Sequence, residues 1–150
     1  MWHTITVNTC NNFCNPECIP AMWNARDFYK NPKEYVSDFE KFTKVSDIYI
    51  TGHFYGNDAP VILTREMLKA NDCKIKVVAD VSCDVNGPIA CTLRSSTIAE
   101  PLYGYLPDEN KEVDVFHPAA IVVMAVDNLP CELPKDASDG FGEMFVQHVV

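Results

Sequence analysis

The sequence predicts an α/β fold built on a parallel β-sheet. Three short apolar runs have the composition and length of buried strands, at residues 48–51, 76–80 and 120–126. Helical segments are expected before, between and after them, at residues 32–43, 65–70 and 139–148. Strand–helix–strand units of this kind form parallel pairs with right-handed crossovers. An antiparallel pairing of the first two strands would contradict this prediction.

The first expected helix begins with favourable residues. Asn31 can cap it, Pro32 suits its first turn, and acidic Glu34 complements the helix dipole. Aromatic residues then recur with the spacing of one helical face, at Tyr35, Phe39 and Phe42. We therefore expect one amphipathic helix packed on the sheet, and we assign no chemistry to its aromatic residues.

Shorter signals predict the remaining elements. Strand-like runs occur at residues 2–7 and 102–105, whereas residues 107–115 are charged and are expected to form a surface turn. Thr64 can cap the short second helix. Ser138 is expected to cap the last helix, whose apolar stripe includes His148 and must pack on something.

Polar side chains follow two of the expected strands at the point where each strand ends. Asp80, Ser82 and Asp84 follow one strand, and Asp127 and Asn128 follow another. In open parallel sheets, ligands bind in the crevice beyond the carboxyl ends of the strands. The sequence 86–88, Asn-Gly-Pro, predicts a sharp turn beside this crevice, with glycine tolerating a positive φ.

Composition narrows the classes of partner. A chain of 150 residues that is 47% hydrophobic is expected to form one domain with a substantial core. The net charge of −9 gives no basic footprint for nucleic acid or anionic lipid. Phosphate-containing cofactors stay compatible with this charge because backbone amides and helix N-termini can hold phosphate. The longest apolar run, residues 119–126, is too short to span a membrane.

The seven cysteines are expected to be reduced thiols. Residues 1–4 lack the basic and apolar regions of a secretory signal, so a cytoplasmic location is expected. Cys10, Cys14 and Cys18 lie at four-residue intervals, which leaves a metal site as an alternative. We favour ordinary thiols and no metal, because structural zinc sites use close cysteine pairs and prolines interrupt this segment.

Two ordered motifs resemble the lysine-forming saccharopine dehydrogenases, whose superfamily includes alanine dehydrogenase and proton-translocating transhydrogenase. The first is DVSCD at 80–84, followed by the Asn-Gly turn and by SSTI at 95–98. The second is VDNLP at 126–130, followed by LPK at 133–135. The resemblance covers about residues 28–150.

The resemblance implies that this chain corresponds to the C-terminal portion of such an enzyme. The fold would be the second half of a Rossmann-type NAD(P)-binding domain with parallel strands. A C-terminal helix would return towards a substrate domain. We divide the chain into a partial dinucleotide-binding domain, residues 1–130, and a C-terminal loop and helix, residues 131–150. No G-x-G-x-x-G follows an expected strand, so the phosphate-binding turn would belong to a remaining N-terminal part of the enzyme.

The resemblance also implies site residues. Asp84 would be catalytic, by stabilising positive charge near the reacting carbon. Apart from the resemblance, Arg94 lies in the same region of the sequence and could bind the carboxylate of an amino-acid or opine substrate, with a solvated loop arginine as the equal alternative. The contacts to NAD, or alternatively NADP, would come from Gly52, His53, Phe54, Tyr55, Val81, Ser82, Asp84, Val126, Asn128 and Leu129. For His53 a packed turn is an equal alternative, and for Asp80 a turn carboxylate that bonds nearby amides is favoured.

Two function classes follow. The first is part of an NAD(P)-dependent amino-acid or opine dehydrogenase, which transfers a hydride between nicotinamide and an amino acid or its imine adduct. The second is a non-catalytic fragment or binding module that lacks the glycine-rich phosphate turn. Transhydrogenase is a weaker third option because that role needs a membrane partner. A homo-oligomer stays open.

Overall fold

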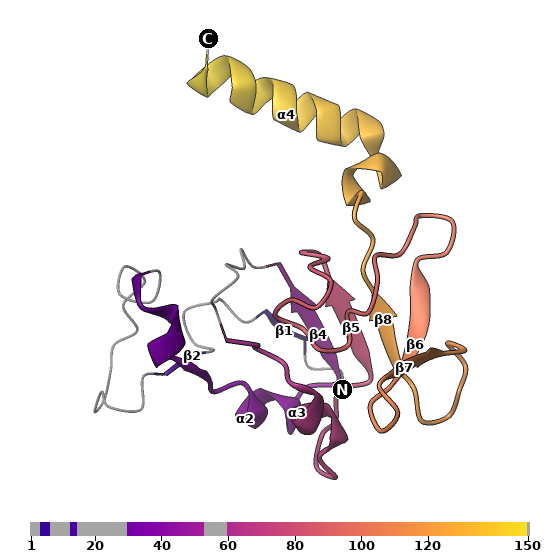
Figure 1. Ribbon diagram of the computed structural model, residues 1–150. Helices are drawn as coiled ribbons and strands as arrows, with labels where there is room; N and C mark the ends of the chain where they lie inside the picture. The colour runs from indigo at the N-terminus through magenta and orange to yellow at the C-terminus, as the bar shows by residue number, and fades with distance from the viewer. Residues whose placement is uncertain (1–3, 7–12, 15–29, 53–59, 150) are drawn as a thin grey trace.

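A computed structural model describes residues 4–6, 13–14, 30–52 and 60–149 of the chain (Figure 1). Its main feature is a six-stranded sheet with the order β1-β4-β5-β8-β6-β7. The strands in that order are β1 (Thr4–Thr6), β4 (Ile48–Thr51), β5 (Val77–Asp80), β8 (Ile121–Met124), β6 (Leu102–Leu106) and β7 (Lys111–Val113). Strands β1, β4, β5 and β8 are parallel, whereas β6 and β7 are antiparallel to their neighbours. The predicted α/β class and its parallel strands are thus confirmed.

The helix between β4 and β5 forms where the sequence predicts it. Helix α3 (Arg65–Lys69) begins after Thr64, whose hydroxyl accepts a hydrogen bond of 3.3 Å from the backbone N–H of Met67. This cap satisfies one of the free donors of the first helical turn. Segment 60–64 then lies against residues 88–90, because the backbone N–H of Ile62 donates to the carbonyl of Pro88 at 2.8 Å.

The prediction of one helix over residues 32–43 is wrong. The segment forms a 3₁₀ turn, η2 (Pro32–Glu34), then strand β3 (Val36–Ser37) and one helical turn, α2 (Glu40–Thr43). Strand β3 pairs antiparallel with β2 (Phe13–Cys14), and this contact with a distant segment overrides the local helical pattern. Asn31 forms no side-chain cap.

The core lies on one face of the sheet. Alternate residues of paired strands share that face, so Tyr49, Val78 and Val123 lie side by side and are buried. Phe39 also reaches the core, with its ring centroid 4.5 Å from that of Tyr49. The buried residues that complete the core are Tyr35, Ile62, Leu63, Leu68, Ile75, Ile89, Cys91, Tyr103, Tyr105 and Ile121.

Residues 107–115 were expected to form a surface turn, but they also include strand β7. The β6–β7 hairpin closes over Asn110, which has a φ of 51° and accepts a 2.7 Å hydrogen bond from the Tyr105 hydroxyl. The charged residues that suggested a turn are those of an exposed edge strand, where charge discourages pairing with other chains.

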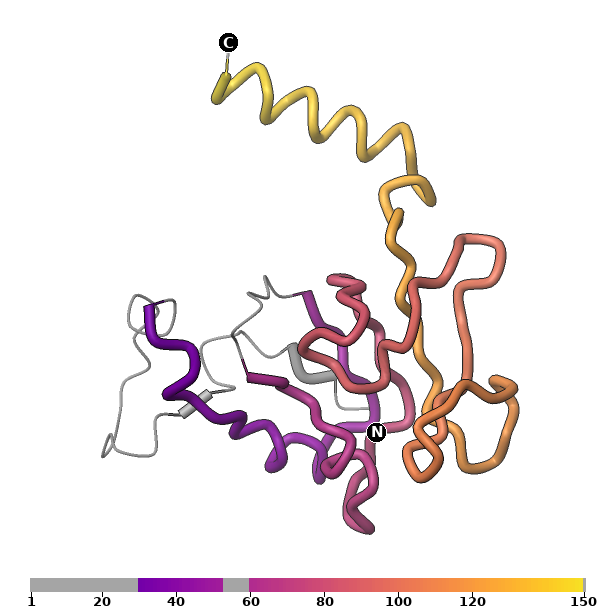
Figure 2. The backbone as a smooth tube through the Cα atoms, viewed as in Figure 1, coloured from indigo at the N-terminus to yellow at the C-terminus, as the bar shows by residue number. Residues whose placement is uncertain are grey.

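Helix α4 (Pro134–His148) follows a 3₁₀ turn, η3 (Leu129–Glu132), and projects away from the sheet (Figures 1 and 2). It begins at Pro134 rather than after the predicted cap Ser138, because proline suits the first helical turn. None of its residues is buried, His148 included, and the Phe141 ring stays exposed beside Phe145. The expected packing of its apolar stripe is absent from the described part of the chain. Within that part, no helix is long and apolar enough to cross a membrane.

We predict that Gly104→Ala destabilises the fold. A Cβ atom at Gly104 would lie 2.5 Å from the carbonyl oxygen of Asp114 and 3.0 Å from the Cβ of Ala120. The two backbones would have to separate, which costs about 1–3 kcal/mol of unfolding free energy. Urea unfolding measures this loss. Gly142→Ala is the matched control, because a Cβ there meets nothing within 4 Å; an equal loss in both variants would contradict the prediction.

Candidate functional site

The carboxyl ends of three parallel strands meet at one edge of the sheet. The chain leaves β8 towards α4 at this edge, and residues 81–101, which connect β5 to β6, also begin there (Figure 2). The backbone N–H of Val81 donates to the carbonyl of Thr51 at 2.8 Å. Gly52 lies beside Val81, since a Cβ on Gly52 would be 3.9 Å from the Val81 Cβ. We call this edge, with residues 52, 81–84 and 126–129, the strand-end crevice, after the place where open parallel sheets bind their ligands.

Asp80 lies beneath the strand-end crevice and is fully buried. One carboxylate oxygen, Oδ1, accepts hydrogen bonds from the backbone N–H groups of Ser82 and Cys83, at 3.1 and 3.2 Å. The other, Oδ2, accepts a 2.6 Å hydrogen bond from the hydroxyl of Thr92. This set of bonds agrees with the favoured interpretation of Asp80 as a turn carboxylate.

The protonation of Asp80 reflects these surroundings. Burial raises the pKa of its carboxyl above the ordinary value, and the hydrogen bonds from Thr92, Cys83 and Ser82 act in the opposite direction. The negative charge of Asp84 adds a small upward contribution to the Asp80 pKa. Asp80 is therefore a buried carboxyl that is tied by hydrogen bonds to the backbone of the turn that follows it.

Asp84 is presented by a tight turn. The backbone N–H of Gly87 donates to the carbonyl of Asp84 at 2.9 Å, and the Asp84 side chain is partly exposed. The positive φ expected at Gly87 is found instead at Asn86, with a φ of 57°. Glycine is needed at position 87 for another reason: a Cβ there would lie 2.5 Å from the Cβ of Asp84. The Asp84 carboxylate forms no ion pair with the described residues.

Ser96 supports the end of β8. Its backbone N–H donates to the carbonyl of Ala125 at 2.7 Å, and its hydroxyl accepts from the N–H of Ala125 at 3.0 Å. The same hydroxyl donates to the carbonyl of Pro101 at 2.9 Å. Val126, which follows, is buried, whereas Asn128 is exposed and Leu129 half-buried. Ser96 and Thr92 were not identified as site residues from the sequence, because the connection contains several other polar residues and nothing in their local pattern sets these two apart.

Arg94 is engaged by its own chain. Its guanidinium donates two hydrogen bonds of 2.8 Å to the carboxylate of Glu112 on β7, and it lies 4.8 Å from the centroid of the Tyr103 ring. The same pairing lowers the pKa of the Glu112 carboxyl. Binding of a substrate carboxylate by Arg94 would therefore require exchange with Glu112.

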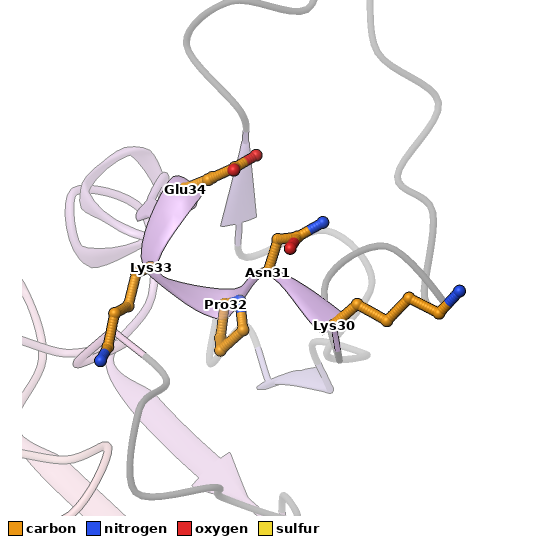
Figure 3. A pocket seen from close by; sticks show the side chains of 5 residues that line it. All are labelled: Lys30, Asn31, Pro32, Lys33 and Glu34. Carbon is orange, nitrogen blue, oxygen red and sulfur yellow. The ribbon is translucent and has the colours of Figure 1, made fainter.

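A shallow hollow lies elsewhere, around η2. Figure 3 shows its lining, in which the long side chains of Lys30 and Lys33 point in different directions, away from each other. The remaining lining residues are Asn31, Pro32 and Glu34. None of the predicted site residues lines this hollow.

Some predicted residues lie outside the described part of the chain. These are His53, Phe54 and Tyr55, together with Cys10 and Cys18. Over the described residues, no group of three or more histidine, cysteine or acidic side chains is arranged to hold a metal ion. The structure brings together the strand-end residues Gly52, Val81 and Ser82, with Asp84 on the turn that follows.

Comparison with protein-family models identifies the family of this chain. The model described as the alanine dehydrogenase/PNT C-terminal domain matches residues 21–150. The chain belongs to this family. The sheet is accordingly that of a Rossmann-type NAD-binding C-terminal domain, with its strand-end crevice where such domains bind ligands.

Curated relatives agree with the alanine dehydrogenase/PNT family. An alpha-aminoadipic semialdehyde synthase of Arabidopsis thaliana is 28% identical over 122 residues, which cover 79% of this chain and 12% of that protein. A mitochondrial alpha-aminoadipic semialdehyde synthase of Rattus norvegicus is 26% identical over 147 residues, 86% of this chain and 16% of that protein. A saccharopine dehydrogenase [NAD(+), L-lysine-forming] of Schizosaccharomyces pombe is 32% identical over 110 residues, 70% of this chain and 28% of that protein.

The chain therefore spans between about one eighth and somewhat over a quarter of the length of these relatives. The resemblance stated from the two motifs is confirmed at the level of the superfamily. At the strand-end crevice, a Cβ atom on Gly52 would meet the Cβ of Val81 at an ordinary contact distance of 3.9 Å, and the Val81 side chain is 47% exposed.

Proposed function

We propose that this chain forms the nicotinamide-binding half of an NAD(P)-dependent amino-acid or opine dehydrogenase. The observation that carries the proposal is the placement of Asp84, on a tight turn beside the exposed Val81 at the carboxyl end of β5. Membership of the alanine dehydrogenase/PNT family and the similarity to a lysine-forming saccharopine dehydrogenase support it. The reaction would join or separate an amino acid and its partner through an imine.

Each residue of the strand-end crevice has its own role in this proposal. The bound nicotinamide supplies the hydride chemistry. Val81 provides an exposed apolar wall, whereas the side chain of Val126, expected as the second wall, is buried. Gly52 and Ser82 bring backbone close to the cofactor. Asn128 offers an amide for a carboxamide or ribose hydroxyl, and Leu129 packs beside it. Asp84 places a negative charge near the carbon that becomes cationic as the imine forms.

The alternative is a non-catalytic binding module. It rests on one feature of the sequence, the lack of a G-x-G-x-x-G after any strand within these 150 residues. In the dehydrogenase proposal, the pyrophosphate is instead held by an N-terminal part of the enzyme, in keeping with the much greater length of the relatives. The choice between NAD and NADP, oligomer formation and the cytoplasmic location stay predictions.

The affinity of the complete enzyme for NAD or NADP distinguishes the dehydrogenase from the non-catalytic module. We predict that these 150 residues alone bind NAD weakly or not at all, because the phosphate-binding turn anchors a dinucleotide. Joined to a glycine-rich N-terminal half, in the complete enzyme, they should bind NAD or NADP with micromolar affinity. Isothermal titration calorimetry measures both.

Two results of this titration would count against the proposal. Micromolar binding by the 150 residues alone would show that the phosphates are held by residues of this chain that we have not assigned. Absence of binding by the complete enzyme would favour the non-catalytic module.

A further inference from the structure

Thr92 is a buried polar residue that the proposed chemistry does not use. It lies in the connection between β5 and β6 and is 1% exposed. Its backbone N–H donates to the carbonyl of Ile89 at 3.1 Å, so the position of its main chain does not depend on its hydroxyl. Among the residues that the structure describes, the hydroxyl makes one hydrogen bond, of 2.6 Å, to Oδ2 of Asp80.

That contact continues into the strand-end crevice. Oδ1 of the same carboxylate holds the N–H groups of Ser82 and Cys83, and the Cys83 thiol donates to the carbonyl of Asp80 at 3.1 Å. Cys83 adopts a φ of 56°, a conformation that side-chain-bearing residues keep only when neighbouring contacts enforce it. Cys83 immediately precedes Asp84, so the left-handed residue sets the direction in which Asp84 is presented.

We propose that Thr92 is a positioning residue of the strand-end crevice, which acts through Asp80 to hold the turn that presents Asp84. The Thr92 hydroxyl fixes the rotation of the Asp80 carboxylate. With that rotation fixed, Oδ1 stays in line with both amides of the turn. This inference rests on the proposed function, because it gives the turn a purpose only if Asp84 takes part in the reaction.

Three variants of the complete enzyme test the proposal. Thr92→Val removes the hydroxyl and keeps the shape of the side chain, whereas Thr92→Ser keeps the hydroxyl. Thr43→Val is the matched structural control, since Thr43 is also fully buried and its hydroxyl donates to the carbonyl of Glu40 at 2.8 Å, on α2. The readouts are melting temperature, amide hydrogen exchange at Ser82 and Cys83, and the separate values of kcat and KM.

For Thr92→Val we expect exchange at Ser82 and Cys83 to accelerate and kcat to fall about tenfold, with KM for the dinucleotide within about twofold, because misplacing a catalytic group affects the chemical step. Thr92→Ser should restore both values. Thr43→Val should lower the melting temperature about as much as Thr92→Val does. It should leave kcat and hydrogen exchange at the Ser82 and Cys83 amides unchanged.

Other outcomes would overturn the inference. A Thr92→Val enzyme with wild-type kcat, or one with no change in exchange at the two amides, would reduce Thr92 to an ordinary buried residue. If the wild-type complete enzyme showed no dehydrogenase turnover at all, the proposed function would fail and take this inference with it. The two failures are distinct, because the first needs an active wild type.

Discussion

Replacing Asp84 with asparagine is expected to lower the turnover of the complete enzyme by about 10²–10³-fold, or roughly 3–4 kcal/mol of transition-state stabilisation. The amide keeps the size of the side chain and the Gly87 hydrogen bond, which uses the backbone carbonyl of Asp84. It loses the negative charge that stabilises a cationic imine. Steady-state kinetics with the amino-acid substrate measures the effect, and the melting temperature should change little.

Asp108→Asn provides the matched control for this variant. It removes the same unit of charge from an exposed turn, where the carboxylate lies 3.7 Å from Lys69. Its turnover should stay within about twofold of the wild type, because an exposed pair contributes little energy. A normal turnover in Asp84→Asn, or an equal loss in both variants, would remove Asp84 from the reaction.

Replacing Asp80 with asparagine is expected to cost stability, by about 1–3 kcal/mol for a disturbed set of buried hydrogen bonds. The loss should depend on pH. Burial raises the pKa of the Asp80 carboxyl in the folded state, so its contribution to stability is fully present below the ordinary carboxyl pKa. The contribution declines as pH rises through the raised value. The variant cannot titrate, so the difference in stability between wild type and variant should shrink over this range.

Urea unfolding from about pH 4, near the ordinary carboxyl pKa, to pH 8 measures the difference between the two proteins. Asp47→Asn serves as the comparison, because Asp47, just before β4, carries a partly exposed carboxylate paired with Lys76. A stability difference for Asp80→Asn that grows with pH would show that the folded state favours the charged form of Asp80. If Asp80→Asn lost turnover without any loss of stability, Asp80 would be the catalytic carboxylate and the assignment of Asp84 to this role would be wrong.

The sequence predicted the parts of the fold that depend on local composition. The strands at 48–51, 76–80 and 120–126 were expected within a few residues of β4, β5 and β8, because β-branched runs identify buried strands without reference to partners. The parallel pairing of β4 and β5 followed from the helix between them. The helix expected at 32–43 failed because Val36 and Ser37 pair with residues 13–14, a contact that no local pattern reveals.

The site could be predicted only in part for the same reason. Asp80 and Asp84 stand out because carboxylates follow a buried strand. The Thr92 hydroxyl bonds Asp80, 12 positions before it, and the Ser96 hydroxyl bonds Ala125, 29 positions after it. Their roles therefore appear only once the chain is folded. Likewise, the sequence shows Arg94 as a free cation near the motif, whereas the hairpin brings Glu112 within 2.8 Å of it.

The central claim is that a nicotinamide dinucleotide binds at the carboxyl ends of β4, β5 and β8. Hydrogen–deuterium exchange of the complete enzyme, with and without saturating NAD or NADP, tests it most directly. The account predicts that the dinucleotide slows exchange at residue 52, at residues 81–84 and at residues 126–129. Exchange in the hollow at residues 30–34 should not change. Protection confined to that hollow, or to the β6–β7 hairpin, would contradict it.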